Sequence, residues 1–485
     1  MNQKESEEKR QVGLNISVKA FLGAVLLLVA LIILAGVLTR VLPQGSYDRQ
    51  TVNGNTLIVP GSYREIQASP LPLWRWATAP FEVLASPDSA MAIGVMAFLI
   101  LIGGTFYILD KCGMLRHVMG RLINRFAGSK YKMLALLAAV FMAMGSMIGV
   151  FEEAITLVPI AVAISYSMGW DALVGLGISS FAVAVGFAAG TFNPFTVGVV
   201  QNIAELPMYS GLWLRAVIFL LAYGAMAFFL LRYARRIEAN PSRSLLAAQN
   251  ETMRAHYSAD VDEATLSDPR LKKSVRVFCF ILLGVFCYIL AGFFIKGLTD
   301  YTLIVMALGF TAGGFAVGKI SRYGKSVFKD FCRGMLSVLP AVLMILLAMG
   351  VKQVITAGGV LDTILYRLSS LIQGQSAYAS ALLIYAIVLV FNALIGSASA
   401  KGFLLMPLLT PLADMAGVTR QTAVLAFVLG DGFSNVIYPT NAALLVMLGL
   451  AGVSWGKWFR WTWKFQLAML IMSIGAICLA VTVGY

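Results

Sequence analysis

A few charged side chains lie inside long apolar runs, where their type and position could support chemistry. Glu152 and Glu153 are adjacent in one run, Lys401 interrupts a second, and Asp431 lies between two glycines in a third. Ionisable residues at membrane depth are costly and typically serve ions, protons or polar solutes. The glutamates could bind a cationic group or a proton. Lys401 could pair with Glu152 or Glu153, bind a carboxylate, or take the place of a bound monovalent cation.

Glu152, Glu153 and Lys401 also have purely structural interpretations. An acid suits the first turn of a helix, so Glu152 or Glu153 could cap the segment that follows. The long side chain of Lys401 could reach the external surface. Asp431 could ligate a cation or take up a proton.

Glycines and polar residues interrupt the apolar runs at four places. We name these the first tip (149–156), the first break (190–196), the second tip (396–402) and the second break (430–441). Interrupted helices leave unpaired backbone groups, positive at N-terminal ends and negative at C-terminal ends. The hydroxyl and amide groups here could equally join helices to one another. The candidate substrate ligands are Glu152, Glu153, Thr156, Thr191, Asn193, Thr196, Ser397, Ser399, Lys401, Asn435, Thr440 and Asn441, and the candidate ion-coupling residues are Asp431, Ser434 and Ser146.

The composition predicts that these segments lie in lipid. The 485 residues are 59% hydrophobic and 12% charged, with a mean hydropathy of +0.83, whereas soluble proteins carry about a quarter charged residues. The net charge of +14 comes from basic clusters between apolar runs, a pattern typical of cytoplasmic loops rather than of nucleic-acid binding. Five cysteines without Cys-x-x-Cys spacing and two histidines outside the apolar runs favour neither a metal site nor a disulfide framework.

We therefore expect an all-α polytopic protein of the inner (cytoplasmic) membrane, with the N-terminal segment 1–19 in the cytoplasm and no cleavable signal. Two halves, 20–232 and 275–485, flank a cytoplasmic linker at 233–274. The predicted crossings are 20–42, 89–109, 212–232, 277–296, 301–319, 335–355 and 465–483; re-entrant hairpins are predicted at 133–168 and 378–415, broken helices at 171–205 and 421–449, an external loop at 43–88, and amphipathic stretches at 110–126 and 359–372.

The two halves correspond to one another. Gly113-Met114-Leu115 matches Gly359-Val360-Leu361, and Pro159 matches Pro407 at a nearly constant offset. The predicted topology lets the two hairpins enter from opposite sides, which makes the pair an inverted repeat. Inverted repeats of this kind provide alternating access to one central site, so the sequence favours a secondary transporter over an enzyme or a channel.

The motifs resemble those of the C4-dicarboxylate anaerobic carrier (DcuC) family. The similar segments are Glu152-Glu153-Ala154-Ile155-Thr156, Gly190-Thr191-Phe192-Asn193-Pro194-Phe195 and Leu429-Gly430-Asp431-Gly432-Phe433-Ser434-Asn435. The resemblance covers roughly 20–485 and is closest to the YfcC-like branch, whose members are provisionally described as basic amino acid antiporters. It implies membership of the ion transporter superfamily, a homodimer, a scaffold domain with an elevator-type transport domain, and tips and breaks that hold substrate and sodium.

The second tip departs from the family pattern. That branch reads like Pro-Ser-Gly-Ser-Gly-Gln, whereas this chain has Gly396-Ser397-Ala398-Ser399-Ala400-Lys401. A fixed ammonium group there suggests that Lys401 replaces a coupling cation, which favours exchange or proton coupling.

The charges favour a small basic amino acid, such as arginine or ornithine, as substrate. A dicarboxylate facing Glu152 and Glu153 would meet like charge, whereas a cationic side chain would gain from the pair. A sodium- or proton-coupled carboxylate transporter is the alternative. A channel, or an enzyme with a Ser–Lys pair from Ser397 or Ser399 and Lys401, is disfavoured, and no cofactor beyond a coupling Na⁺ or H⁺ is expected.

Overall fold

The computed structural model describes residues 18–52, 55–67, 69–86, 89–115, 117–118, 120–121, 128–149, 151–248, 267–292, 301–321 and 326–485. Six of its helical stretches are long and apolar enough to cross a membrane, namely 92–111, 130–148, 212–239, 327–357, 377–394 and 455–483. Four shorter apolar helices lie at 25–41, 154–167, 172–188 and 304–320. A mostly helical chain with this many membrane-length helices is a multi-pass membrane protein.

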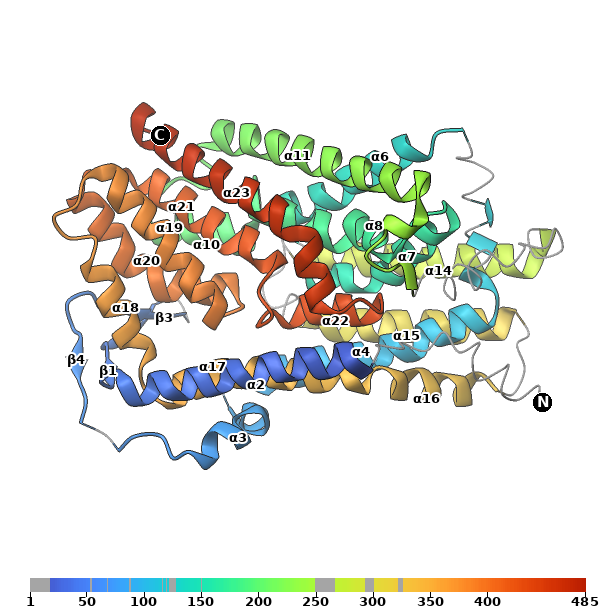
Figure 1. The fold of residues 1–485 in the computed structure, drawn as a ribbon, viewed down its shortest axis with the longest axis horizontal. Coiled ribbons are helices and arrows are strands. Elements are labelled where there is room, and N and C mark those ends of the chain that lie inside the picture. The colour runs from blue at the N-terminus through green and yellow to red at the C-terminus, as the bar shows by residue number, and fades with distance from the viewer. Residues whose placement is uncertain are drawn as a thin grey trace.

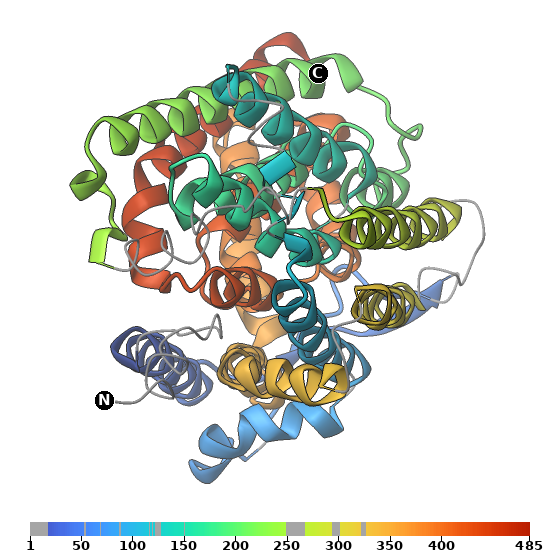
Figure 2. The ribbon, with the colours of Figure 1, turned by 90° about the vertical axis from the view of Figure 1, so that its right-hand side faces the viewer.

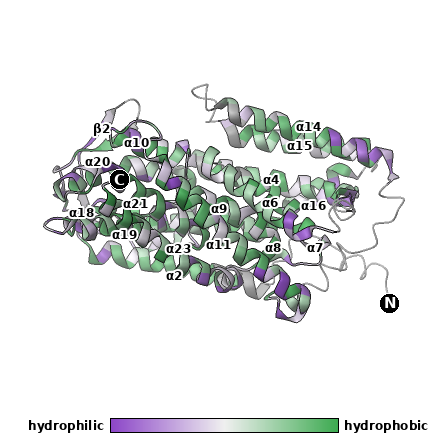
Figure 3. Ribbon diagram, turned by 90° about the horizontal axis from the view of Figure 1, so that it is seen from above, coloured by the Kyte–Doolittle hydropathy of each residue, from purple (hydrophilic) through white to green (hydrophobic). Residues whose placement is uncertain are grey.

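Continuous helices form the outer parts of the molecule (Figures 1 and 2). They are α2 (Val18–Val41), α4 (Ser89–Lys111), α11 (Leu212–Ala239), α14 (Pro269–Gly292), α15 (Thr302–Ile320), α16 (Val327–Ser337), α17 (Leu339–Ala357), α18 (Leu361–Ser370) and α23 (Trp455–Val483). Within this set α4 packs on α15 and α16, and α17 packs on α2. In Figure 1 these lie along the lower side, opposite α11 and α23. Hydrophobic residues dominate the helices along their length (Figure 3).

Interrupted helices lie between these two groups. The first half contains α6 (Lys130–Ala143), α7 (Val158–Ser167), α8 (Ala172–Leu176), α9 (Ala182–Ala188) and α10 (Val199–Ile203), with π-helical turns at Met144–Ile148, Gly177–Phe181 and Pro194–Gly198 and a 3-10 turn at Glu152–Leu157. The second half contains α19 (Ala377–Leu394), α20 (Ala398–Met415), α21 (Arg420–Gly432), a 3-10 turn at Phe433–Val436, and α22 (Ala442–Leu450). The interruptions at 149–151, 189–193, 395–397 and 437–441 overlap or adjoin the predicted tips and breaks.

Local sequence explains where the helices stop. Gly149 has a left-handed backbone with φ of 76°, which glycine adopts without steric cost. At the first break, Pro194 occupies the first position of the next helical turn, where its missing N–H costs nothing.

The segment 43–88, predicted to be external, differs from the expected all-helical fold. It carries four short strands, β1 (Gly45–Ser46), β2 (Arg49–Val52), β3 (Asn55–Ile58) and β4 (Arg64–Glu65), and the helix α3 (Trp74–Glu82). The pairs β1–β4 and β2–β3 are antiparallel. The strands form in a polar stretch that has no apolar face long enough for a helix.

Asp362 on α18 anchors this strand-bearing segment. Its Oδ1 and Oδ2 atoms both lie 2.8 Å from Arg49 Nη2, and Oδ2 also accepts a hydrogen bond of 3.0 Å from the backbone N–H of Tyr47. Tyr63 stacks on Tyr366 with 4.1 Å between ring centroids. These contacts fix the segment to the second half of the chain.

Several helix ends differ from the predicted boundaries. The helix α11 continues to Ala239, beyond the expected end at 232, and α14 begins at Pro269, before 277. Charged residues with good helix propensity extend both helices past the apolar runs. The amphipathic stretch expected at 110–126 falls partly outside the described residues, as do the N-terminal segment 1–17 and much of the linker at 249–266.

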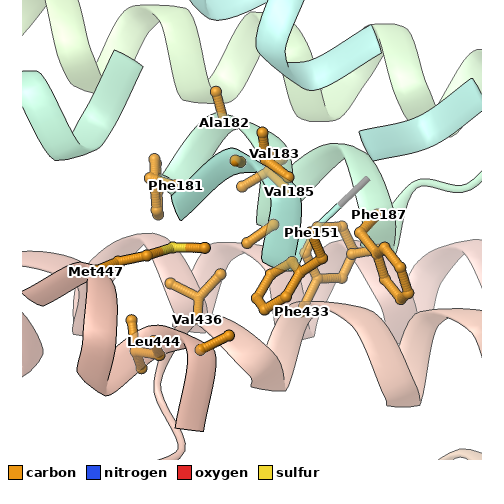
Figure 4. Close-up of a cluster of buried hydrophobic side chains, with 14 of the residues drawn as sticks. Phe151, Phe181, Ala182, Val183, Val185, Phe187, Phe433, Val436, Leu444 and Met447 are labelled. Atoms are coloured by element: carbon orange, nitrogen blue, oxygen red, sulfur yellow. The ribbon is translucent and has the colours of Figure 1, made fainter. Parts of the chain in front are cut away.

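A buried apolar cluster packs the interrupted helices together (Figure 4). It includes Phe151 from the first tip and Phe433 from the second break, and the ring of Phe151 meets that of Phe187 edge-on, with 5.7 Å between the ring centroids. The backbones also approach closely. A Cβ atom on Gly186 of α9 would lie 1.9 Å from the carbonyl oxygen of Met142 on α6, so only glycine fits at this contact.

Replacing Gly186 by alanine is therefore expected to lower the thermal unfolding temperature of the detergent-solubilised protein. The new methyl group must separate α6 from α9, and overpacking of this kind costs about 1–3 kcal/mol. Gly475→Ala on α23 is the matched control, because a Cβ atom there has no neighbour within 4 Å. Equal unfolding temperatures for the two variants would contradict the close packing of α6 on α9.

Candidate functional site

Ser146 joins the segment before the first tip to the first break. Its carbonyl oxygen accepts hydrogen bonds from the backbone N–H groups of Thr191 at 3.0 Å and Phe192 at 3.2 Å. Its hydroxyl donates to the carbonyl oxygen of Ala189 at 2.7 Å and lies 3.1 Å from the Thr191 hydroxyl. These contacts satisfy backbone groups that the end of α9 leaves free, so Ser146 has a structural role at this junction.

Three candidate ligands cap the N-terminal ends of the helices that follow the interruptions. Asn193 Oδ1 accepts from the N–H of Phe195 at 2.9 Å, Ser397 caps α20, and Asn441 caps α22. Capping uses the side-chain oxygen of each residue. The Nδ2 group of Asn193 is buried and has no hydrogen-bond partner among the described residues, so it is available to another acceptor.

A fully buried ion pair joins the second tip to the second break. Lys401 Nζ lies 2.5 Å from Asp431 Oδ1, and both side chains have 0% exposure. The same ammonium group donates to the carbonyl oxygen of Ile395 at 2.8 Å and to Asn392 Oδ1. Apart from Lys401, no donor in the described part of the chain hydrogen-bonds to either carboxylate oxygen of Asp431.

Asn392 on α19 organises this pair. While its Oδ1 accepts from Lys401, its Nδ2 donates to the carbonyl oxygen of Asp431 at 2.9 Å, to Ser434 Oγ at 2.6 Å and to Asn435 Oδ1 at 3.0 Å. One amide thus bonds both to the lysine and to the second break. The sequence analysis missed Asn392, although an asparagine inside an apolar helix is itself a signal of a polar partner.

The four interruptions lie against one another. Ser399 Oγ of the second tip donates to the carbonyl oxygen of Phe195 in the first break at 2.9 Å. A Cβ atom on Gly149 would lie 2.5 Å from Asn193 Oδ1, and one on Gly432 would lie 2.0 Å from Ala188 Cα. The 3-10 turn of the first tip also contacts α22. We call this meeting point the break cluster.

The remaining candidates also belong to the break cluster. Thr196 and Thr440 have buried hydroxyl groups without a hydrogen-bond partner among the described residues. Thr156 is buried in the first tip. The backbone of Glu152 and Glu153 begins the 3-10 turn Glu152–Leu157, and their side chains lie outside the part that the structure describes.

One interpretation of Lys401 is corrected: its side chain does not extend to the surface, because it is buried in the first turn of α20. It pairs with Asp431, and its predicted pairing with Glu152 or Glu153 falls on side chains outside the described part of the structure. Helix packing brings this pair together across a separation in sequence that local patterns do not reveal. The Ser–Lys pair that the sequence disfavours is not formed here, since the ammonium group bonds to Ile395 and Asn392, Ser397 caps a helix, and Ser399 donates to Phe195.

Removing one member of the buried pair is expected to destabilise the fold strongly. Lys401→Met leaves an unpaired buried carboxylate, a change that costs about 3–5 kcal/mol. Thermal unfolding should show a large loss for Lys401→Met and a smaller one for Lys401→Met combined with Asp431→Asn, because the double variant leaves no unpaired charge. Lys464→Met, which replaces an exposed lysine of α23, serves as the control. Asp431→Asn alone completes the cycle, and additive effects of the two single substitutions would show that the pair is not coupled.

Membrane-length helices around a buried polar cluster define a membrane transporter, and comparison with known proteins identifies its family. Residues 22–482 match the model of the C4-dicarboxylate anaerobic carrier (DcuC) family. The chain therefore belongs to this family, which confirms the resemblance seen in its motifs.

Two relatives extend the comparison. The chain is 30% identical over 418 residues to the provisionally named basic amino acid antiporter YfcC of Escherichia coli (strain K12), covering 84% of this chain and 81% of that protein. It is 24% identical over 512 residues to an uncharacterised protein of Haemophilus influenzae Rd, covering 96% and 97% of the two chains.

Two solved structures of transporters are similar over nearly the whole chain. The YdaH transporter of Alcanivorax borkumensis is 17% identical, with 95% of this chain and 99% of that chain covered and a TM-score of 0.42. MtrF of Neisseria gonorrhoeae, described with a class of antimetabolite efflux pumps, is 17% identical, with 94% of each chain covered and a TM-score of 0.42. At these values neither assigns a mechanism to this chain.

Proposed function

We propose that this transporter exchanges small basic amino acids, such as arginine and ornithine, across the cytoplasmic membrane. The observation that carries the proposal is the break cluster, where four helix interruptions meet and bring together polar groups from both halves of the chain. Interrupted helices at a shared midpoint are the usual binding architecture of secondary transporters.

The charges of the break cluster support a cationic substrate. Lys401 and Asp431 neutralise each other, so the remaining formal charges in the tips and breaks are those of Glu152 and Glu153. Like charge in a medium of low dielectric constant costs several kcal/mol, and opposite charge gains a comparable amount. A basic amino acid therefore suits the cluster better than a dicarboxylate does.

The substrate's own carboxylate also has suitable partners. The helical segments beginning at Pro194, Ala398 and Ala442 start at the break cluster, and helix N-termini favour negative charge. The unpaired Nδ2 of Asn193 and the hydroxyl groups of Thr196 and Thr440 are hydrogen-bond donors of the right kind. We assign these groups to the α-carboxylate and the two glutamates to the side-chain cation.

A sodium- or proton-coupled carboxylate transporter is the second candidate. The description of the family itself favours it, and the helix N-termini in the break cluster would suit a carboxylate. In that case the two glutamates would bind coupling ions or cap the first tip.

The wider architecture follows the same proposal. We infer an inverted repeat of 20–232 and 275–485, with an elevator-type transport domain around the break cluster, a scaffold domain, and a homodimer in the inner membrane with the N-terminus in the cytoplasm. Support comes from the matched interruptions in the two halves and from the basic clusters predicted to face the cytoplasm.

Counterflow in proteoliposomes tests the substrate. Vesicles loaded with unlabelled arginine should take up labelled arginine and ornithine, with no requirement for a sodium gradient. Labelled succinate should not enter. Succinate uptake driven by sodium, without arginine counterflow, would replace the proposal by the carboxylate alternative.

Glu152→Gln and Glu153→Gln are each expected to reduce arginine counterflow by about tenfold or more, because a hydrogen bond to a charged group is worth roughly 1.5–3 kcal/mol. Glu65→Gln is the control, since that side chain is 59% exposed and lies in the external strand segment. Unaltered counterflow in both glutamine variants would remove the charge argument.

A further inference from the structure

The ammonium group of Lys401 lies among three oxygen atoms of three chemical types. They are the carboxylate oxygen Oδ1 of Asp431 at 2.5 Å, the carbonyl oxygen of Ile395 at 2.8 Å, and the amide oxygen of Asn392. Carboxylate, amide and backbone carbonyl oxygens are the ligands that hard metal cations take from proteins. The ammonium group of Lys401 is therefore surrounded by oxygen atoms that would also suit a free metal cation.

The C-terminal ends of two helices also favour a cation at this position. Asn392 and Ile395 lie at the C-terminal end of α19, and Asp431 lies in the last turn of α21. The C-terminal end of a helix carries partial negative charge, which stabilises a cation placed beside it. This site thus differs from the helix N-termini of the break cluster, which favour anions.

The pair is also incompletely bonded on its acidic side. Apart from Lys401, no donor among the described residues bonds to either oxygen of Asp431, so the carboxylate depends on one cation for its compensation. A buried ion pair is seldom the most stable way to fill a core, because apolar replacements are often as good or better. A role in the transport cycle explains why a charge is held here.

We propose that Asn392, Ile395 and Asp431 form a monovalent-cation site that the chain fills with the Lys401 ammonium group. A tethered cation makes a coupling sodium ion unnecessary in the wild-type protein. Removing the ammonium group leaves the site with a net charge of −1 and with space for a free cation. The statement about coupling rests on the proposed exchange function, whereas the cation site itself does not.

Thermal unfolding of the full chain in detergent tests the cation site directly. Wild type and Lys401→Ala are compared in NaCl, LiCl, KCl and choline chloride at equal ionic strength, at pH 7 and at pH 8.5. Sodium, lithium or potassium should raise the unfolding temperature of Lys401→Ala by about 3 °C or more over choline, because a ligand that binds only the folded state stabilises it. Wild type should show no difference among the salts.

Two further variants locate the effect. Lys464→Ala, which removes an exposed lysine of α23, should behave like wild type. Lys401→Ala combined with Asp431→Asn should lose the cation-specific shift, because it lacks both charges. A Lys401→Ala protein that folds only when one of these cations is present would support the site equally.

Several outcomes would overturn the proposal. Lys401→Ala could show the same unfolding temperature in all four salts at both pH values, or could fail to fold in each of them. Cation-specific stabilisation of wild type that is unchanged in Lys401→Ala would place the ion elsewhere.

A transport measurement separates this inference from the proposed function. Arginine counterflow by Lys401→Ala should require the cation that raises its unfolding temperature, while wild-type counterflow is equal in sodium and choline. If neither protein transports arginine but the cation still stabilises Lys401→Ala, the substrate assignment fails and the cation site stands. If wild type exchanges arginine and the variant binds no cation, the substrate assignment stands and the cation site fails.

Discussion

Backbone groups freed inside an apolar interior impose the constraint on which this structure depends. Lipid offers no hydrogen bonds, so every interruption of a helix must find partners within the protein. Just after α9, the backbone N–H groups of Thr191 and Phe192 donate to the carbonyl oxygen of Ser146. The end of α21 finds Asn392, which binds the carbonyl oxygen of Asp431. At these two interruptions a residue from another helical segment supplies the partner, and such contacts join distant parts of the chain in one cluster.

The positions of these interruptions could be read from the sequence because their signals are local. Glycine, proline and an adjoining polar residue stop a helix wherever they occur, as Gly149 and the pair Asn193–Pro194 do here. The apolar runs likewise predicted most of the long helices. Their ends were less predictable, since charged residues with good helix propensity carry α11 to Ala239.

Contacts between distant segments could not be predicted in the same way. The sequence pattern suggested Glu152 and Glu153 as acidic partners of Lys401, whereas the packing of α19, α20 and α21 places Lys401 against Asp431, with Asn392 bonded to both residues. The strand pairs within 43–88 were missed for a related reason. They depend on Asp362, which is far away in sequence and becomes a neighbour of Arg49 only when α18 is in place.

The polar residues of the break cluster fall into two groups: those whose side chains are hydrogen-bonded within the protein, and those with a donor that is unpaired among the described residues. Asn441 and Ser397 cap helices with their side-chain oxygens, and Ser434 donates to the carbonyl oxygen of Gly430. Groups committed in this way hold the site in shape. Asn193 belongs to both groups, because its oxygen caps a helix while its amide N–H groups stay unpaired among the described residues. A substrate gains most from such unpaired groups, since each buried donor left without a partner costs about 1–3 kcal/mol. Under the proposed function, substrate binding therefore falls on fewer residues than the sequence pattern suggests.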